Sequence, residues 1–153
     1  MRILYEERDH KRLDKIEQIV ENISNSCNYH VEHNETVRQI EQVFRNNGFY
    51  TTREYPIYVI KNKSNRAGRI DLVARKGKLR VAVEYDHKYN VKYKSFQKII
   101  QIKPDVAIGI TGFGFLDSSV ARAEKYIGKV PIYVISLKQH KYKLLEGNEA
   151  RFI

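Results

Sequence analysis

The chain has almost none of the cysteine that cross-links small or secreted folds through disulfides or metal ions. Its 153 residues include one cysteine, Cys27, and no tryptophan. A single cysteine excludes an internal disulfide framework and a zinc site built from cysteines. No apolar run reaches the roughly 18 residues of a membrane span, and the charged N-terminus lacks the apolar stretch of a signal peptide. We therefore expect an intracellular, cytoplasmic protein with no membrane segment.

Acidic residues are scarce in the middle of the chain. Residues 1–50 hold 7 Lys/Arg and 9 Asp/Glu, whereas residues 51–103 hold 14 Lys/Arg and 4 Asp/Glu, a net charge of +10. That segment carries the equivalent of the formal charge of the whole chain. A basic block in a folded domain often faces a polyanion, because neutralising phosphates releases counterions. The alternative is a generic solubilising surface, and the charge distribution favours nucleic acid over it.

Hydrophobic periodicity predicts one α/β domain over residues 1–153, with a helical extension at 1–30 and a core at 34–137. The predicted helices cover residues 6–23, 34–47, 91–103 and 117–127. The predicted strands cover residues 55–61, 69–74, 79–85, 105–110 and 131–137, and an edge hairpin is expected in the tail from 141 to 153. An early hairpin followed by β-α-β units indicates a mixed sheet with helices on both faces.

Three of the few acids in the basic segment fall within or directly after two predicted strands, at Asp71, Glu84 and Asp86. If Lys76-Gly77 forms a two-residue turn, Asp71 and Glu84 become diagonal neighbours on one sheet face. Adjacent carboxylates repel unless a cation lies between them, and hard oxygen ligands suit Mg²⁺ or Mn²⁺. The alternative is that these acids pair with arginines on a solvated strand face.

The string GRIDLVARKGKLRVAVEYD, residues 68–86, resembles the core of the PD-(D/E)XK nuclease superfamily. In that superfamily an acid on one strand, a glycine-containing turn and an acid-x-Lys strand form a metal-dependent phosphodiesterase site. Asp71 matches the first acid and Glu84 the second. The resemblance covers roughly residues 34–110, and it implies a restriction-endonuclease-like core that uses Mg²⁺ or Mn²⁺.

The sequence departs from this pattern at Asp86, where the superfamily usually has lysine. In some branches that lysine is found on the following helix, and the string KSFQK at 94–98 is similar to such a branch. Lys98 is the favoured replacement, followed by Lys94 and then Lys88. Asp86 itself is a further metal ligand or a partner for that lysine, and without a lysine the site would be inactive.

Glu41 lies within the apolar stripe of the second predicted helix, beside Ile40 and Phe44. Superfamily members often place such a glutamate beside the metal, so Glu41 is a candidate third carboxylate. The alternative is a boundary glutamate that reaches solvent or an arginine. The histidines show no zinc pattern, and His33 is expected to be a surface residue. The segment TGFGF at 111–115 is interpreted as a turn after a strand.

The resemblance and the charge pattern together predict a metal-dependent endonuclease acting on DNA. In this interpretation Asp71 and Glu84 hold the metal, Glu41 and Asp86 assist, and Lys98 stabilises the transition state. A homodimer or higher homo-oligomer would allow two strands to be cut. One alternative is an inactive nucleic-acid-binding module with the same fold, and another is a partner-binding domain with a basic surface.

Overall fold

The computed structural model describes residues 2–57 and 68–147. Its helices are α1 (Arg2–Ser26), α2 (His33–Asn46), α3 (Tyr93–Gln101) and α4 (Leu116–Ala123), which continues into the short 3₁₀ helix η1 (Glu124–Tyr126). Its strands are β1 (Tyr50–Ile57), β2 (Gly68–Lys76), β3 (Leu79–Asp86), β4 (Val106–Thr111), β5 (Ile132–Ser136) and β6 (Lys141–Leu145). The order of helices and strands is the predicted one.

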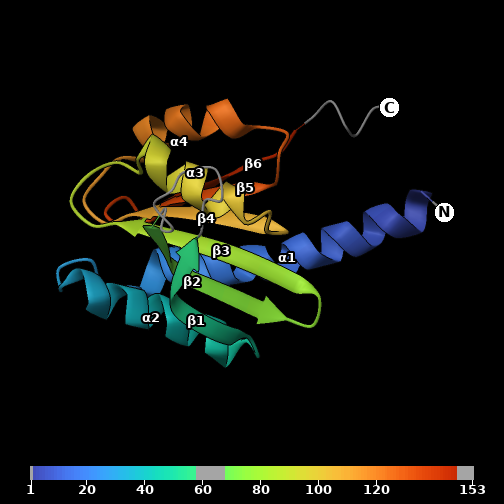
Figure 1. Ribbon diagram of the computed structural model, residues 1–153, viewed down its shortest axis with the longest axis horizontal. Coiled ribbons are helices and arrows are strands. Elements are labelled where there is room, and N and C mark those ends of the chain that lie inside the picture. The colour runs from blue at the N-terminus through green and yellow to red at the C-terminus, as the bar shows by residue number, and fades with distance from the viewer. Residues whose placement is uncertain (1, 58–67, 148–153) are drawn as a thin grey trace.

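The strands form one six-stranded sheet in the order β1-β2-β3-β4-β5-β6 (Figure 1). The first three strands are antiparallel, β3, β4 and β5 are parallel, and β6 returns antiparallel to β5. This confirms the predicted mixed sheet. β1 begins earlier than predicted, while the predicted strand residues 58–61 and the end of the tail, 148–153, lie outside the described residues.

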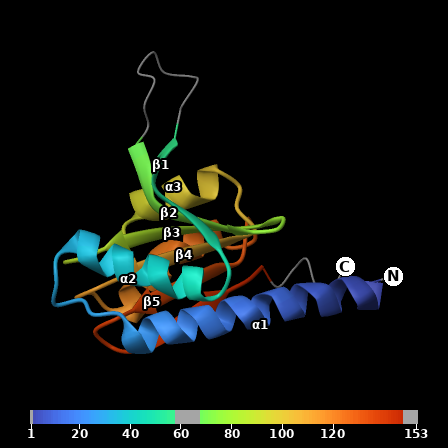
Figure 2. The same cartoon turned by 90° about the horizontal axis from the view of Figure 1, so that it is seen from below.

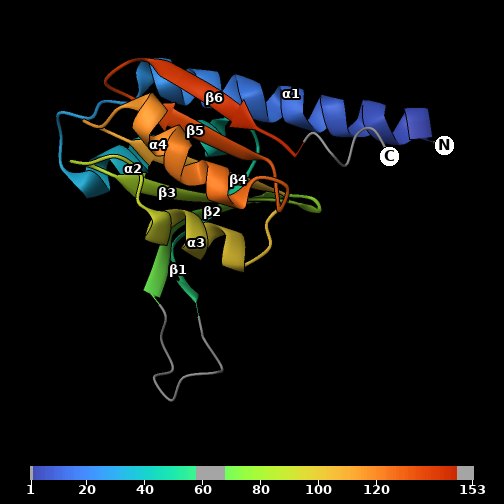
Figure 3. The same ribbon diagram turned by 90° about the horizontal axis from the view of Figure 1, so that it is seen from above.

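Helices cover both faces of the sheet. α1 and α2 pack on one face, and α3 and α4 pack on the other (Figures 2 and 3). Each face has its own hydrophobic cluster, with Phe44 and Val83 in the first and Phe96 and Ala82 in the second. No helix in residues 2–57 and 68–147 combines the length and the apolar composition that crossing a membrane requires.

The turn between β2 and β3 differs from the predicted one. Lys76 pairs with Leu79, so the turn residues are Gly77 and Lys78 rather than Lys76 and Gly77. Gly77 has a φ of 59°, and a glycine with positive φ at the first central position is typical of a type II′ hairpin turn. The pairing Leu72↔Val83, continued by one residue, brings Asp71 directly opposite Glu84 instead of diagonal to it.

β2 also turns over at Asp71. Ile70 and Leu72 are two residues apart and should share a face in a regular strand, yet they belong to the clusters on opposite faces of the sheet. On the neighbouring strand β1, Glu54 has a φ of 52°, which is unusual for a residue other than glycine. Ile70 therefore lies on the opposite face from Leu72 and Ala74, because the strand twists sharply at Asp71.

Two helix ends are also informative. Gly48 follows α2 with a φ of 84°, the left-handed conformation typical of a glycine that ends a helix. Phe115 holds the N-cap position of α4, and Asp117 lies in the first turn of that helix. An acid in the first turn still interacts favourably with the helix dipole.

Candidate functional site

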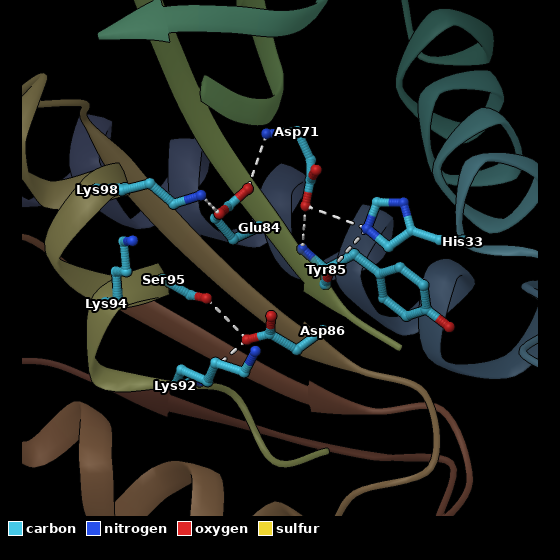
Figure 4. Close-up of a pocket in the computed structure, with 9 residues that line it drawn as sticks. All are labelled: His33, Asp71, Glu84, Tyr85, Asp86, Lys92, Lys94, Ser95 and Lys98. Carbon is cyan, nitrogen blue, oxygen red and sulfur yellow. Dashed lines mark hydrogen bonds and ion pairs between the residues drawn. The ribbon is translucent and has the colours of Figure 1, made fainter. Parts of the chain in front are cut away.

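Asp71 and Glu84 face each other where β2 separates from β3. Beyond the last ladder pair, side chains take the place of backbone acceptors (Figure 4). The Asp71 N–H donates to Glu84 Oε2 at 2.8 Å, and the Tyr85 N–H donates to Asp71 Oδ2 at 2.8 Å. Each carboxylate is therefore anchored by the other strand, and the two predicted metal ligands are brought together.

Lys98 reaches the same carboxylates from α3. Its ammonium forms an ion pair with Glu84 Oε1 and donates to the Arg69 carbonyl at 3.0 Å. The Glu84 side chain is 4% exposed and that of Lys98 is 22% exposed, so the pair lies at the base of the site. The structure thus places the favoured lysine next to Glu84.

Asp86 fixes α3 to the end of β3. Its Oδ2 accepts from the Lys92 N–H at 3.0 Å and from the Ser95 hydroxyl at 2.8 Å. Lys92 is the N-cap residue of α3, so Asp86 satisfies backbone and side-chain donors at the start of that helix. This contact holds the helix that carries Lys98 against the strand that carries Glu84.

His33, at the start of α2, completes the other side of the site. Its Nε2 donates to the Tyr85 carbonyl at 3.0 Å and lies 3.7 Å from Asp71 Oδ2. The Asp71 carboxylate raises the pKa of His33 to about 9, although partial burial opposes this. His33 is still partly exposed, but it also lines the pocket, which was not predicted from the sequence. No local signal could have found His33, because its partners lie about 40 or more residues away in sequence.

Burial and neighbouring charges act differently on the two carboxylates. Burial raises the pKa of Glu84, and the Asp71 carboxylate raises it further, while Lys98 lowers it. Burial also raises the pKa of Asp71, but hydrogen bonds from His33, Glu84 and the Tyr85 N–H outweigh this and leave it lowered. The pair therefore resists holding two negative charges unless a cation compensates them.

Nine side chains line an open pocket around this pair (Figure 4). They are His33, Asp71, Glu84, Tyr85, Asp86, Lys92, Lys94, Ser95 and Lys98. Lys94, the second predicted lysine, is among them, whereas the third, Lys88, is not. Acids thus lie at the base of a pocket that also holds three lysines and a histidine.

Glu41 does not join the pocket. Its Oε2 accepts from the Thr51 hydroxyl at 2.7 Å, and its carboxylate lies 3.6 Å from both Arg45 and Arg53. β1 begins at Tyr50, earlier than predicted, and this brings Thr51 and Arg53 against α2. The expected third carboxylate is instead a buried acid paired with arginines, which was the alternative interpretation.

Asp71 and Glu84 are suited to a divalent cation. They are anchored carboxylates whose mutual repulsion a cation would relieve. Within the described residues, no three side chains of His, Cys, Asp or Glu are grouped to hold a metal ion. Mg²⁺, however, is usually held by one or two carboxylates together with water and phosphate oxygens. The donor set present therefore fits Mg²⁺ or Mn²⁺.

The fold and the site define a mixed α/β protein with paired carboxylates where two adjacent strands separate. Searches of protein-family models and of curated proteins find no match. One solved structure that is similar is the crystal structure of AF1548, a protein of unknown function, with 13% identity and a TM-score of 0.41. The match covers 65% of this chain and 54% of that chain, so the chain spans about half of AF1548. Similarity at this level does not bear on function.

Proposed function

We propose that this protein is a metal-dependent endonuclease that hydrolyses phosphodiester bonds in DNA. The observation that carries the proposal is the pair of anchored carboxylates, Asp71 and Glu84, at the base of a pocket rimmed by lysines. A phosphodiesterase needs a seat for a cation and a positive surface that attracts the phosphate backbone. Both requirements are met by residues within one pocket.

Each pocket residue has a proposed role that follows from its position in the site. Asp71 and Glu84 hold the cation, which when bound would polarise the phosphate and activate water. The Lys98 ammonium, already at Glu84, stabilises negative charge that develops on the phosphate. His33 and Asp86 act as positioning residues, because the first contacts Asp71 and the second holds the start of α3. Lys92 and Lys94, both exposed, contact the backbone phosphates.

The charge around the pocket supports a nucleic-acid substrate. Residues 87–98 contain Lys88, Lys92, Lys94 and Lys98 and no acid. A single pocket cuts one strand at a time, so cleavage of both strands takes two copies of the chain. A homodimer or higher homo-oligomer is therefore the expected form, and its mass in solution can be measured by light scattering with and without DNA.

The test is a nicking assay on supercoiled plasmid with Mg²⁺, Mn²⁺ or EDTA, comparing wild type with Asp71→Asn and Glu84→Gln. We expect nicking that needs the metal and is lost in both variants. Glu35→Gln is the matched control, since Glu35 is an acid of α2 paired with Arg38 outside the pocket. Nicking that survives either pocket substitution, or that is equally lost in the control, would contradict the assignment.

A second candidate function is supported by one observation. The Glu84 carboxylate already has Lys98 and the Asp71 N–H as partners, and position 86 holds an aspartate rather than the superfamily's usual lysine. That arrangement is compatible with a nucleic-acid-binding module that has kept the fold without the activity. Strong, salt-sensitive binding of DNA with no cleavage under any of the metals would favour this candidate.

A further inference from the structure

Exposed aromatic side chains occur in the two loops that follow β3 and β4 and at the first residue of α3. Tyr89 and Tyr93 are 67% and 52% exposed, and Phe113 and Phe115 are 37% and 50% exposed. Among the side chains of residues 13–57 and 68–147, these are four of the six large hydrophobic ones that are exposed. Scattered exposed apolar residues are normal, but a cluster of them marks a binding surface.

This cluster lies beside the carboxylate pocket. β3 and β4 are parallel neighbours, so the loops that follow them leave the sheet at the same edge (Figure 1). The loops are joined by hydrogen bonds from the Phe113 N–H to the His87 carbonyl at 2.9 Å and from the Phe115 N–H to Asn90 Oδ1 at 2.8 Å. The Gly112 N–H donates to the carbonyl of Asp86, a pocket residue, at 3.1 Å.

The two glycines of the segment Gly112-Phe113-Gly114-Phe115 pack closely against neighbouring atoms. A Cβ atom at Gly112 would collide with the Tyr85 hydroxyl and the His87 carbonyl, and one at Gly114 would collide with Thr111 and Asn90. The glycines therefore pack inward where no side chain fits. The backbone between them is therefore closely packed. Phe115 is half exposed, whereas the partly exposed Phe113 ring also packs against the rings of Tyr29 and His87.

Cations accompany these rings. Lys138 Nζ lies 4.8 Å from the centroid of the Phe115 ring, and Arg122 and Lys125 lie 5.9 and 5.8 Å from that of Tyr93. A cation over a ring and within about 6 Å of its centroid is attracted by the ring face. A nucleotide could stack its base on the face that the cation leaves free, while its phosphate meets the charge.

We propose that Tyr89, Tyr93, Phe113 and Phe115, the aromatic loop surface, bind the unpaired bases of single-stranded DNA. This rests on the proposed function, and it makes the preferred substrate one in which a single-stranded segment adjoins the bond to be cut. Paired bases are stacked within a duplex and offer no free face, whereas unpaired bases do. A protein that binds only the phosphate backbone of a duplex needs lysines but no exposed rings. The exposed rings therefore favour unpaired DNA.

The test is fluorescence anisotropy in EDTA with a labelled single-stranded oligonucleotide, its duplex, its RNA counterpart and a version with abasic sites. We expect wild type to bind the single strand more tightly than the other three. The double variant Phe113→Ala/Phe115→Ala should lose about 10- to 100-fold in affinity for the single strand, from the usual worth of base stacking, and little for the duplex. Tyr50→Ala is the matched control, because Tyr50 is 81% exposed on the edge strand β1.

Several results would overturn this proposal. They are equal affinity of wild type and the double variant, undiminished binding of abasic DNA, preference for the duplex or for RNA, and a changed oligomeric state of the free double variant. If the double variant does not fold, Phe115→Ala alone and quenching of 2-aminopurine in the single strand by wild type decide the question. Absence of quenching then contradicts stacking.

The binding measurements do not depend on cleavage, so the two proposals can fail separately. Tight single-strand binding with no metal-dependent cleavage of any substrate would overturn the endonuclease and leave the aromatic loop surface in place. Metal-dependent cleavage together with unchanged single-strand affinity in Phe113→Ala/Phe115→Ala would overturn the aromatic loop surface and leave the endonuclease.

Discussion

Among the side chains of residues 13–57 and 68–147, Glu41 and Glu84 are the two buried acids, 8% and 3% exposed. Glu41 lies in a corner between α2 and β1, where two arginines and a hydroxyl surround it. Glu84 lies between β2 and α3, where it faces a second carboxylate and a single lysine. The negative charge of Glu41 is therefore offset by arginines, whereas that of Glu84 is also opposed by a neighbouring carboxylate.

The contrast separates an acid that is paired with cations from an acid that also faces a like charge. Burying a carboxylate costs free energy that nearby cations and hydrogen bonds offset, as they do at Glu41. At Glu84 the neighbouring Asp71 carboxylate adds to that cost and raises the pKa of Glu84 beyond the effect of burial. Perturbed pKa values of this kind cluster at functional sites. Glu84 is paired with Lys98 and accepts from the Asp71 N–H, but unlike Glu41 it also faces a second carboxylate.

The largest expected effect is on catalysis. Glu84→Gln should lower the rate of metal-dependent cleavage by at least about 10³-fold, because a metal ligand supplies several kcal/mol of transition-state stabilisation. Glu41→Gln should leave the rate close to that of wild type. Single-turnover cleavage of a plasmid measures both, and an equal loss in the two variants would end the distinction between the two glutamates.

Lys98 is expected to come next. Lys98→Met should slow cleavage by about 100-fold, since loss of one donor to developing negative charge typically costs this much. Lys94→Met, one helical turn earlier on α3 and also lining the pocket, is the matched control and should cost less. If the order of the two losses is reversed, Lys94 and not Lys98 serves the site.

Stability should show the opposite pattern. Glu41→Gln leaves Arg45 and Arg53 without their partner, and we expect the free energy of unfolding to fall by about 2 kcal/mol, less than for a fully buried pair because both arginines are partly exposed. Glu84→Gln removes repulsion from Asp71, so its free energy of unfolding should equal or exceed that of wild type. Urea unfolding at neutral pH compares them, and a greater loss in Glu84→Gln would refute this pattern.

Much of this could be predicted from the sequence, because the periods of apolar residues fix the type and order of the elements. Asp71 and Glu84 were recognisable because acids are rare inside strands and rarer in a basic segment. The face on which Asp71 lies was not predictable from alternation. The strand turns over at that residue, and only the packing of Ile70 and Leu72 into opposite clusters reveals it.

The partners of the remaining candidates depended on long-range packing. Glu41 occupies a helix stripe, and a stripe position says that a residue is buried without saying what it meets across the interface. His33 meets Asp71 only because α2 packs over the end of β3, and its position at a helix start looked like an ordinary surface site. Local patterns identify buried or charged residues, while tertiary contacts assign their partners.

The smallest expected effect is that of His33, which tests how much a neighbouring residue of the protein offsets the repulsion between Asp71 and Glu84. His33→Ala should lower cleavage by about 10-fold, the lower end of the cost of losing a residue that orients a ligand. His33→Gln keeps a donor for the Tyr85 carbonyl without the charge, and it should restore part of the rate if the histidine positions Asp71 through this strand. Thermal unfolding of both variants provides the control. If activity falls in proportion to the melting temperature and does not recover in His33→Gln, His33 contributes to stability alone. Its role would then be like that of the arginines that pair with Glu41.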